Sequence, residues 1–200
     1  MPMSFATRWY RRSSALKIGA TGKHGARKTM NPDPDPSRAV VIDLAVPCAK
    51  WRRALPGAEK HAKEAARAAL AGSKKKLGAA ELSLVLSDDA AVAALNERWR
   101  GRAGPTNVLA FATDERPLPG APILLGDVIL AFETVKREAR DQDKPLADHV
   151  RHLIVHGVLH LLGYDHDAAG PARQMETLET RILATLGVAD PYHVKAPIDG

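Results

Sequence analysis

Cysteine is nearly absent from this chain, whose 200 residues include only Cys48. A single thiol cannot form a disulfide within the chain, and it cannot build the cage of thiolates that closes a structural zinc site. Low cysteine usage also suits a reducing compartment. We therefore expect a cytoplasmic protein in which Cys48 packs as a small apolar residue.

Long apolar runs are missing as well, and no stretch could span a bilayer. We expect no transmembrane segment and no membrane partner. The length suits one domain with a hydrophobic core plus an appendage. A formal net charge of +6 favours an anionic partner, because excess positive charge attracts phosphate backbones. A basic surface with no role in nucleic-acid binding is the alternative.

Acidic residues are missing from residues 1–32, which hold seven basic ones: Arg8, Arg11, Arg12, Lys17, Lys23, Arg27 and Lys28. Alternating prolines follow up to Pro36 and forbid a helix there. We interpret residues 1–38 as a basic, proline-rich, disordered extension whose only function would be RNA contact. A transit peptide or a twin-arginine signal has a similar composition, but no apolar segment follows the arginines. A true start at Met30 is the other alternative.

Three histidines between His156 and His166 have the spacing of a metal site. Residues 150–162 are largely apolar and predict a buried helix, on which His156 and His160 share one face. Gly163 stands where helices commonly end in a left-handed residue, and the sharp turn that follows can bring back His166. Three imidazoles with a fourth position open to water are typical of catalytic zinc. The sequence therefore predicts one zinc ion per chain, held by these three histidines.

Neighbouring residues leave alternatives open. His152 is also four residues from His156, so those two could form the pair, although no third ligand follows as closely. We interpret His152 as supporting a ligand or contacting substrate, and His149 as a solvated residue at the helix start. Asp165 either orients a ligand imidazole through its second nitrogen or caps the turn after Gly163. Ordinary histidines on a half-buried helix are the simplest alternative.

A glutamate is missing beside the first ligand. The histidines and Gly163 match the metzincin protease signature, H-E-x-x-H-x-x-G-x-x-H, but Gly157 takes the place of its glutamate. Glycine has no side chain to transfer a proton, so peptide hydrolysis by that route is not expected. Zinc alone lowers the pKa of a bound water to about 7, which is sufficient for reaction at an anionic centre such as a phosphodiester.

Arginines next to a tryptophan supply the positive charge that a phosphoryl transition state requires. Guanidinium groups beside an aromatic ring suit a nucleic-acid strand, since they can contact its phosphates and bases. Three arginines, Arg98, Arg100 and Arg102, flank Trp99 in this way. The residues expected to contact substrate are Arg98, Trp99, Arg102 and His152. Alternatively, Trp99 belongs to the core and the arginines form a solvated face.

Several segments together carry a family pattern. Residues 156–166 read H-G-V-L-H-L-L-G-Y-D-H, and the accompanying segments are Leu95–Gly101, Pro105–Leu109, Leu125–Asp127, Met175–Glu179 and Asp190–Tyr192. Together they resemble the YbeY-type rRNA-maturation endoribonucleases over roughly residues 39–193. The resemblance implies a zinc-dependent hydrolase that cleaves single-stranded RNA in 16S rRNA 3′-end maturation and late ribosome quality control.

The resemblance also implies roles and partners. His156, His160 and His166 correspond to zinc ligands, and Arg100 to the family's functionally important arginine. We therefore expect Arg100 to stabilise charge on the scissile phosphate. Expected partners are single-stranded RNA, rRNA and the small ribosomal subunit, with ribosomal proteins or an assembly GTPase beside them. The chain departs from the family in the second motif: Ala103-Gly104 replace a charged pair, and Ala110 and Ala112 replace Ser and Pro.

Alternating strand and helix patterns predict a mixed α/β (α+β) domain over residues 39–193, with one small mixed sheet flanked by helices and a zincin-like metal helix. Residues 194–200 form a tail. Strands are expected at Ala39–Val46, Leu82–Leu86, Val108–Phe111 and Val128–Leu130. Helices are expected at Glu59–Leu70, from the N-cap Asp88 to Trp99, at Phe132–Asp141, from Pro145 through the histidines, and at Pro171–Leu186.

Two functions from other classes remain open. A zinc peptidase would need a carboxylate from elsewhere in the fold, and it would cleave unstructured protein but not RNA. A non-catalytic ribosome-assembly factor would use its metal only to brace the fold. Loss of a ligand would then damage stability and RNA association without abolishing a chemical step.

Overall fold

The structure, a computed structural model, describes residues 40–113, 121–165 and 169–192. Three predictions fall outside these ranges: the extension over residues 1–38, the tail over residues 194–200, and His166 as third ligand.

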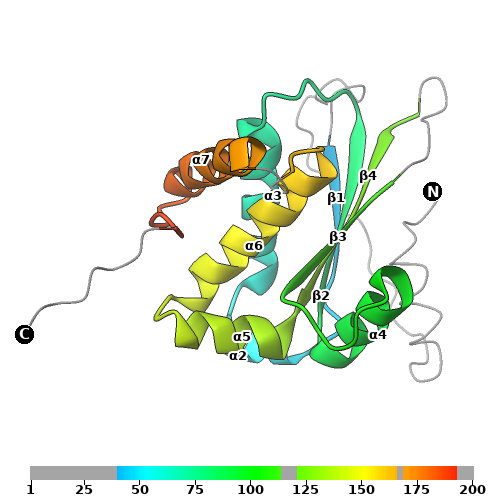
Figure 1. Ribbon diagram of the computed structural model, residues 1–200, viewed down its shortest axis with the longest axis vertical. Coiled ribbons are helices and arrows are strands. Elements are labelled where there is room, and N and C mark those ends of the chain that lie inside the picture. Colours follow the sequence, from blue (N-terminus) through cyan, green and yellow to red (C-terminus); the bar gives the residue numbers. More distant parts are fainter. Residues whose placement is uncertain (1–39, 114–120, 166–168, 193–200) are drawn as a thin grey trace, which may run out of the picture.

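Four strands form one mixed sheet in the order β1-β2-β4-β3 (Figure 1). The strands are β1 (Val40–Ala45), β2 (Ala80–Ser87), β3 (Val108–Ala112) and β4 (Ile123–Ala131). β1, β2 and β4 are parallel, whereas β3 runs antiparallel to β4 at the edge. β2 and β4 are covered on both faces, so that every one of their residues is buried or half-buried. The predicted mixed sheet is confirmed.

β4 is longer than predicted, because Gly126 interrupts the apolar pattern without ending the strand. The pairing of β2 with β4 shifts register between Glu81 and Leu82, opposite this glycine. Gly126 has a φ of 126°, and a Cβ there would overlap the carbonyl oxygen of Phe111 on β3. Only glycine tolerates this conformation and this approach, so the strand continues through it.

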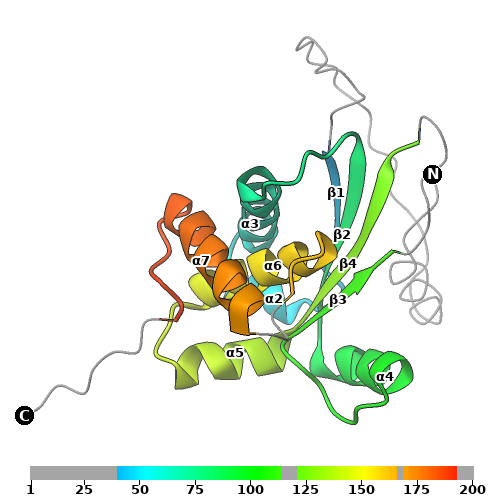
Figure 2. The same cartoon turned by 45° about the horizontal axis from the view of Figure 1, so that its top comes forward.

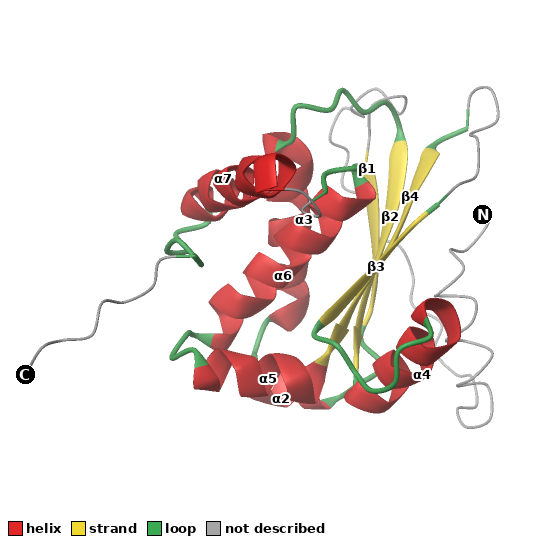
Figure 3. Ribbon diagram, in the orientation of Figure 1, coloured by secondary structure: helices red, strands yellow, loops and turns green. Residues whose placement is uncertain are grey.

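Helices cover both faces of the sheet, as Figures 1 and 3 show: α3, α5, α6 and α7 lie on one face and α4 on the other. The described helices are α2 (Lys50–Ala54), α3 (Ala58–Gly72), α4 (Asp89–Arg100), α5 (Phe132–Asp141), α6 (Leu146–Leu161) and α7 (Ala169–Thr185). Asp88 caps α4 as predicted, since its Oδ1 accepts the N–H of Ala91 at 3.0 Å. α7 begins two residues before Pro171. The first turn of a helix tolerates proline, because proline lacks an N–H and the N–H groups of that turn have no partner within the helix.

The short helix α2 was not predicted, because five residues are too few to show a helical period. Tertiary contacts hold it instead. Trp51 is fully buried, its Nε1 donates to the carbonyl of Ser87 at 2.8 Å, and its ring lies edge-on to Phe132 at 5.1 Å between centroids. Cys48, just before α2, is buried among apolar residues, as predicted.

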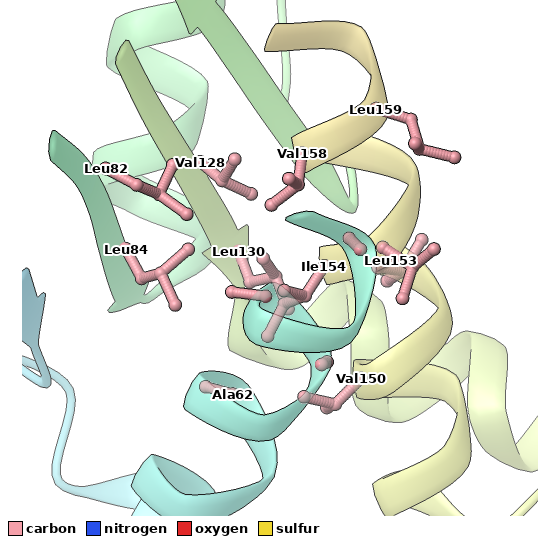
Figure 4. Close-up of a cluster of buried hydrophobic side chains, with 14 of the residues drawn as sticks. Ala62, Leu82, Leu84, Val128, Leu130, Val150, Leu153, Ile154, Val158 and Leu159 are labelled. Carbon is pink, nitrogen blue, oxygen red and sulfur yellow. The ribbon is translucent and has the colours of Figure 1, made fainter. Parts of the chain in front are cut away.

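Alternate side chains of the central strands enter two separate cores. Leu82 and Leu84 of β2 and Leu130 of β4 face α6, where they meet Ile154 (Figure 4). The intervening side chains pack beneath α4, in a smaller cluster formed by Val85, Val92, Leu95, Leu109, Ile129 and Ala131. Each fully buried aliphatic side chain contributes about 1.5–3 kcal/mol to folding. α6, which carries the predicted ligands, is therefore anchored in the larger core.

Among the helices within the described ranges, none combines the length and apolar character needed to cross a membrane.

Candidate metal centre and nucleic-acid cleft

α6 lies close to the sheet because Gly157 faces the strands. A Cβ at this position would lie 2.7 Å from Val128 Cγ1 and 3.4 Å from Val108 Cγ2. Both neighbours are β-branched and therefore stiff about χ1. A glutamate, as in the metzincin signature, would not fit unless the helix moved. Close packing thus accounts for the glycine, and it leaves no room for the protease's base at this position.

His156 and His160 are arranged as the helical spacing predicts. Both rings are partly exposed, and their Nε2 atoms lie 3.1 Å apart. Two nitrogens bound to one tetrahedral zinc ion, at Zn–N distances of about 2.0–2.1 Å, would be separated by about 3.3 Å. The observed separation therefore fits two ligands of the same ion with little movement of either ring.

The turn after α6 has the predicted form. Gly163 has a φ of 78°, in the left-handed region, and the N–H of Tyr164 donates to the carbonyl of Leu159 at 3.0 Å. The part of this turn that the structure describes stops at Asp165, immediately before His166. Within the described ranges, no three His, Cys, Asp or Glu side chains form a group that could hold a metal. The three-histidine site stays a prediction that depends on a residue outside those ranges.

Glu179 of α7 was missed by the sequence reasoning. It is fully buried, and its Oε1 lies 2.9 Å from Nδ1 of His156. Its Oε2 lies 3.2 Å from Nε2 of His152 and accepts a hydrogen bond from the hydroxyl of Tyr192. A carboxylate at Nδ1 requires the proton there and leaves a lone pair on Nε2 of His156, the atom that faces His160. Glu179 thus fixes the tautomer that a metal ligand needs.

Two opposing effects set the charge of Glu179. Burial by itself raises its pKa, but the hydrogen bonds from His152 and His156 outweigh burial and lower the pKa to about 2. Burial, together with the contact to Glu179, raises the pKa of Tyr192. At neutral pH the carboxylate is therefore anionic and the tyrosine is a neutral donor.

A sequence signal for Glu179 did exist. Met175, Leu178 and Ile182 of α7 are buried, and Glu179, four residues after Met175, shares their apolar face. A charged residue on such a face is buried only with partners. Those partners could not be predicted from the sequence, because His156 lies 23 residues before Glu179.

His152 does not form a ligand pair with His156, and His149 is not exposed to solvent. Nε2 of His152 is directed to Glu179, and its ring centroid is 6.4 Å from that of His156, so the two do not converge as His156 and His160 do. His149 was predicted to be solvated, which is wrong: it is only 3% exposed. The start of α6 packs against α5, where Glu138 lies 2.9 Å from the ring of His149. Burial lowers the pKa of His149, while Glu138 opposes that change.

A cleft of about 520 Å³ brings the predicted arginine to the histidines. The lining residues include Arg100 and Arg102, Asn107, the β3 residues Val108, Ala110 and Ala112, and His156, His160 and Asp165. Two segments far apart in sequence thus face the same space. The substitutions at Ala110 and Ala112, where this chain departs from the YbeY pattern, both lie on the wall of the cleft.

Asn96 positions the arginine-bearing loop. α4 ends after Arg100 at Gly101, which has a φ of 62°. The buried Asn96 side chain donates to the carbonyl of Gly104 at 2.9 Å, and the backbone carbonyl of Asn96 accepts the N–H of Arg102 at 3.4 Å. These bonds fold the loop back onto α4, which explains in physical terms why Leu95-Asn96 belongs to the motif.

The sequence pattern of the endoribonuclease YbeY family matches residues 50–187. The chain belongs to the YbeY family. Relatives named endoribonuclease YbeY include one from Paramagnetospirillum magneticum, 55% identical over 159 residues that cover 76% of this chain and 97% of the relative. Another, from Bradyrhizobium sp., is 44% identical over 174 residues, covering 85% of this chain and all of the relative.

The YbeY match includes Arg100, His156, His160 and Glu179, whereas Tyr192 lies beyond its end. Three residues predicted to contact substrate are not on the wall of the cleft: Arg98, Trp99 and His152. Trp99 is 48% exposed, so the alternative that placed it in the core is wrong. The guanidinium carbon of Arg98 lies 5.4 Å from the centre of the Trp99 ring.

Proposed function

We propose that this YbeY-family endoribonuclease cleaves single-stranded RNA with one zinc ion per chain, held by His156, His160 and His166. Its expected role is in 16S rRNA 3′-end maturation and late ribosome quality control in the cytoplasm. The observation that carries the metal proposal is the pair of Nε2 atoms 3.1 Å apart, with one tautomer set by Glu179.

We expect some residues of the site to hold the metal ion and others to bind the phosphate of the RNA. A zinc ion would polarise a phosphate oxygen or a water molecule beside it. Arg100 contributes a guanidinium to the same cleft, where it would donate to the non-bridging oxygens of the scissile phosphate. Arg102 adds a second positive charge. Glu179 keeps His156 in the orientation and tautomer required of a ligand.

The expected preference for single strands is supported by the shape of the cleft. An unpaired strand can bend so that one phosphate enters the cleft beside Arg100, His156 and His160, whereas a stiff duplex cannot bend its backbone in this way. The partners we propose are therefore single-stranded RNA and the rRNA of the small ribosomal subunit, with ribosomal proteins or an assembly GTPase bringing the enzyme to it.

The test uses a labelled single-stranded RNA spanning a 16S rRNA 3′ end, and the same RNA annealed to its complement. We expect the parent to cleave the single strand and spare the duplex, and His160→Ala to lose both zinc and cleavage. Arg100→Ala should keep its zinc and melting temperature but lose at least tenfold in kcat/KM. Arg98→Ala, from the same helix end but outside the cleft, is the matched control. A folded, zinc-loaded parent that cleaves no RNA would favour the assembly-factor alternative.

A further inference from the structure

A second recess, of about 510 Å³, lies beside α7 and shares no lining residue with the metal cleft. We call it the α7 recess. Its polar lining residues include Lys74, Tyr164, Arg173, Gln174, Thr177 and Arg181, with no acidic residue among them. Figure 2 shows α7 beside the C-terminal end of α3, from which the chain continues into the turn that contains Lys74.

The cations of the α7 recess form an ordered row. Arg173, Thr177 and Arg181 are four residues apart on α7 and therefore share one face. The two arginines are eight residues apart, which corresponds to about 12 Å along a helix axis. Nucleotides of a stacked strand rise by about 3.4 Å each, so this row is long enough for several phosphates.

Tyr164 joins the α7 recess to the metal centre. Its hydroxyl accepts the backbone N–H of Lys74 at 3.3 Å, and Lys75 Nζ lies 5.9 Å from its ring centroid. These contacts hold the exposed turn formed by Lys74, Lys75 and Lys76 against the turn that follows α6. Asp165, the next residue after Tyr164, lines the metal cleft. Adjacent residues of one turn thus face the two recesses, and a strand leaving one has a short path to the other.

The cations that line the α7 recess have no carboxylate partner among the residues that the structure describes. Within residues 40–113, 121–165 and 169–192, no carboxylate forms an ion pair with Lys74, Arg173 or Arg181. Lys50, by contrast, is paired with Glu133. Guanidinium groups without a carboxylate partner are suited to bind phosphate.

We propose that the α7 recess binds phosphates of the RNA strand outside the cleavage centre, so that the substrate passes from the metal cleft over Tyr164 onto α7. This inference rests on the proposed RNA substrate and adds a second contact region to it. The exposed turn formed by Lys74, Lys75 and Lys76 is then part of the substrate-binding surface.

The test removes the three cations together, as Lys74→Gln/Arg173→Gln/Arg181→Gln. A control triple variant, Arg53→Gln/Lys60→Gln/Lys136→Gln, removes the same charge from α2, α3 and α5, away from both recesses. RNA binding is measured by fluorescence anisotropy in a His160→Ala background, so that cleavage does not interfere. Two RNAs share the cleavage sequence: a short one, and a long one extended at both ends.

The expected result is a weaker salt dependence of binding for the long RNA only. Each phosphate contact with a single strand contributes about 0.7 to the slope of log Kd against log salt, so losing three should lower the slope by about 2. Affinity for the short RNA, and its cleavage by the same triple variant with His160 intact, should not change. Arg173→Lys/Arg181→Lys, which preserves charge, should retain the parent slope.

Two results would overturn the proposal. An unchanged slope for the long RNA would assign the α7 recess to another ligand, such as an acidic protein. An equal loss in the control triple variant would show that net charge, and not this recess, is responsible. If the parent with His160 intact cleaves neither RNA, the proposed function fails, while the anisotropy slopes still decide whether the recess binds RNA.

Discussion

Replacing Glu179 with glutamine tests the buried contact that orients His156. Glutamine preserves the shape of the side chain but removes its charge. Its amide also puts an NH2 group in place of one of the two oxygens that accept from His156, His152 and Tyr192. The pKa of Glu179 is about 2, against an ordinary value of 4.5. A difference of about 2.5 pH units corresponds to roughly 3 kcal/mol of folding free energy at neutral pH.

The pH dependence follows from the direction of this difference. Because the pKa is lower in the folded state, the contribution of Glu179 is complete above pH 4.5 and is lost as the pH falls towards 2. We expect metal-free Glu179→Gln to be less stable than the parent by roughly 3 kcal/mol at pH 7, with a gap that narrows between pH 4.5 and 2. Zinc affinity should fall 10- to 100-fold, as is typical when a ligand histidine loses its supporting partner.

Urea denaturation at several pH values measures the first effect, and competition with a chromophoric chelator at pH 7 measures the second. Glu176→Gln is the matched control, because Glu176 is exposed on the same helix, and it should change stability by less than about 0.5 kcal/mol. The reasoning is refuted if Glu179→Gln matches the parent at pH 7, or if its deficit is the same at pH 3 as at pH 7.

Two further substitutions test how the site is positioned. Gly157→Ala gains about 1 kcal/mol of helix propensity but places a Cβ 2.7 Å from Val128 Cγ1, so we expect a net loss of about 1–2 kcal/mol in thermal or urea unfolding; equal or greater stability would mean that α6 is free to move away from the sheet. Asn96→Ala removes the bond to Gly104, so kcat/KM for RNA should fall while zinc content is unchanged; unaltered kinetics would mean that the loop holds its place without Asn96.

Elements with a strong local pattern could be predicted from the sequence. α5 has the bounds expected of it, Asp88 caps α4, and Gly163 adopts the left-handed conformation that was assigned to it. Each depends on chemistry confined to a few neighbouring residues: an amphipathic period, a side-chain acceptor, and a residue without Cβ.

Elements that depend on distant partners could not be predicted. α2 forms because Trp51 is buried in the core. β4 is longer than predicted because Gly126 allows the strand to pass close to the backbone of β3. His149 is buried because α5 packs over the start of α6. The histidine pair was predictable because a single helix turn creates it, whereas Glu179 reaches the same site from α7. Tertiary packing decides these features, and local sequence does not encode them.

The most direct test of the central claim is restoration of RNA cleavage by zinc. The parent and His160→Ala would be stripped of metal with a chelator, their metal content measured, and cleavage of the labelled single-stranded RNA followed as zinc is returned. We predict that stripping abolishes cleavage by the parent, that one zinc ion per chain restores it, and that His160→Ala recovers neither metal nor activity. Undiminished cleavage by the metal-free parent would contradict the account.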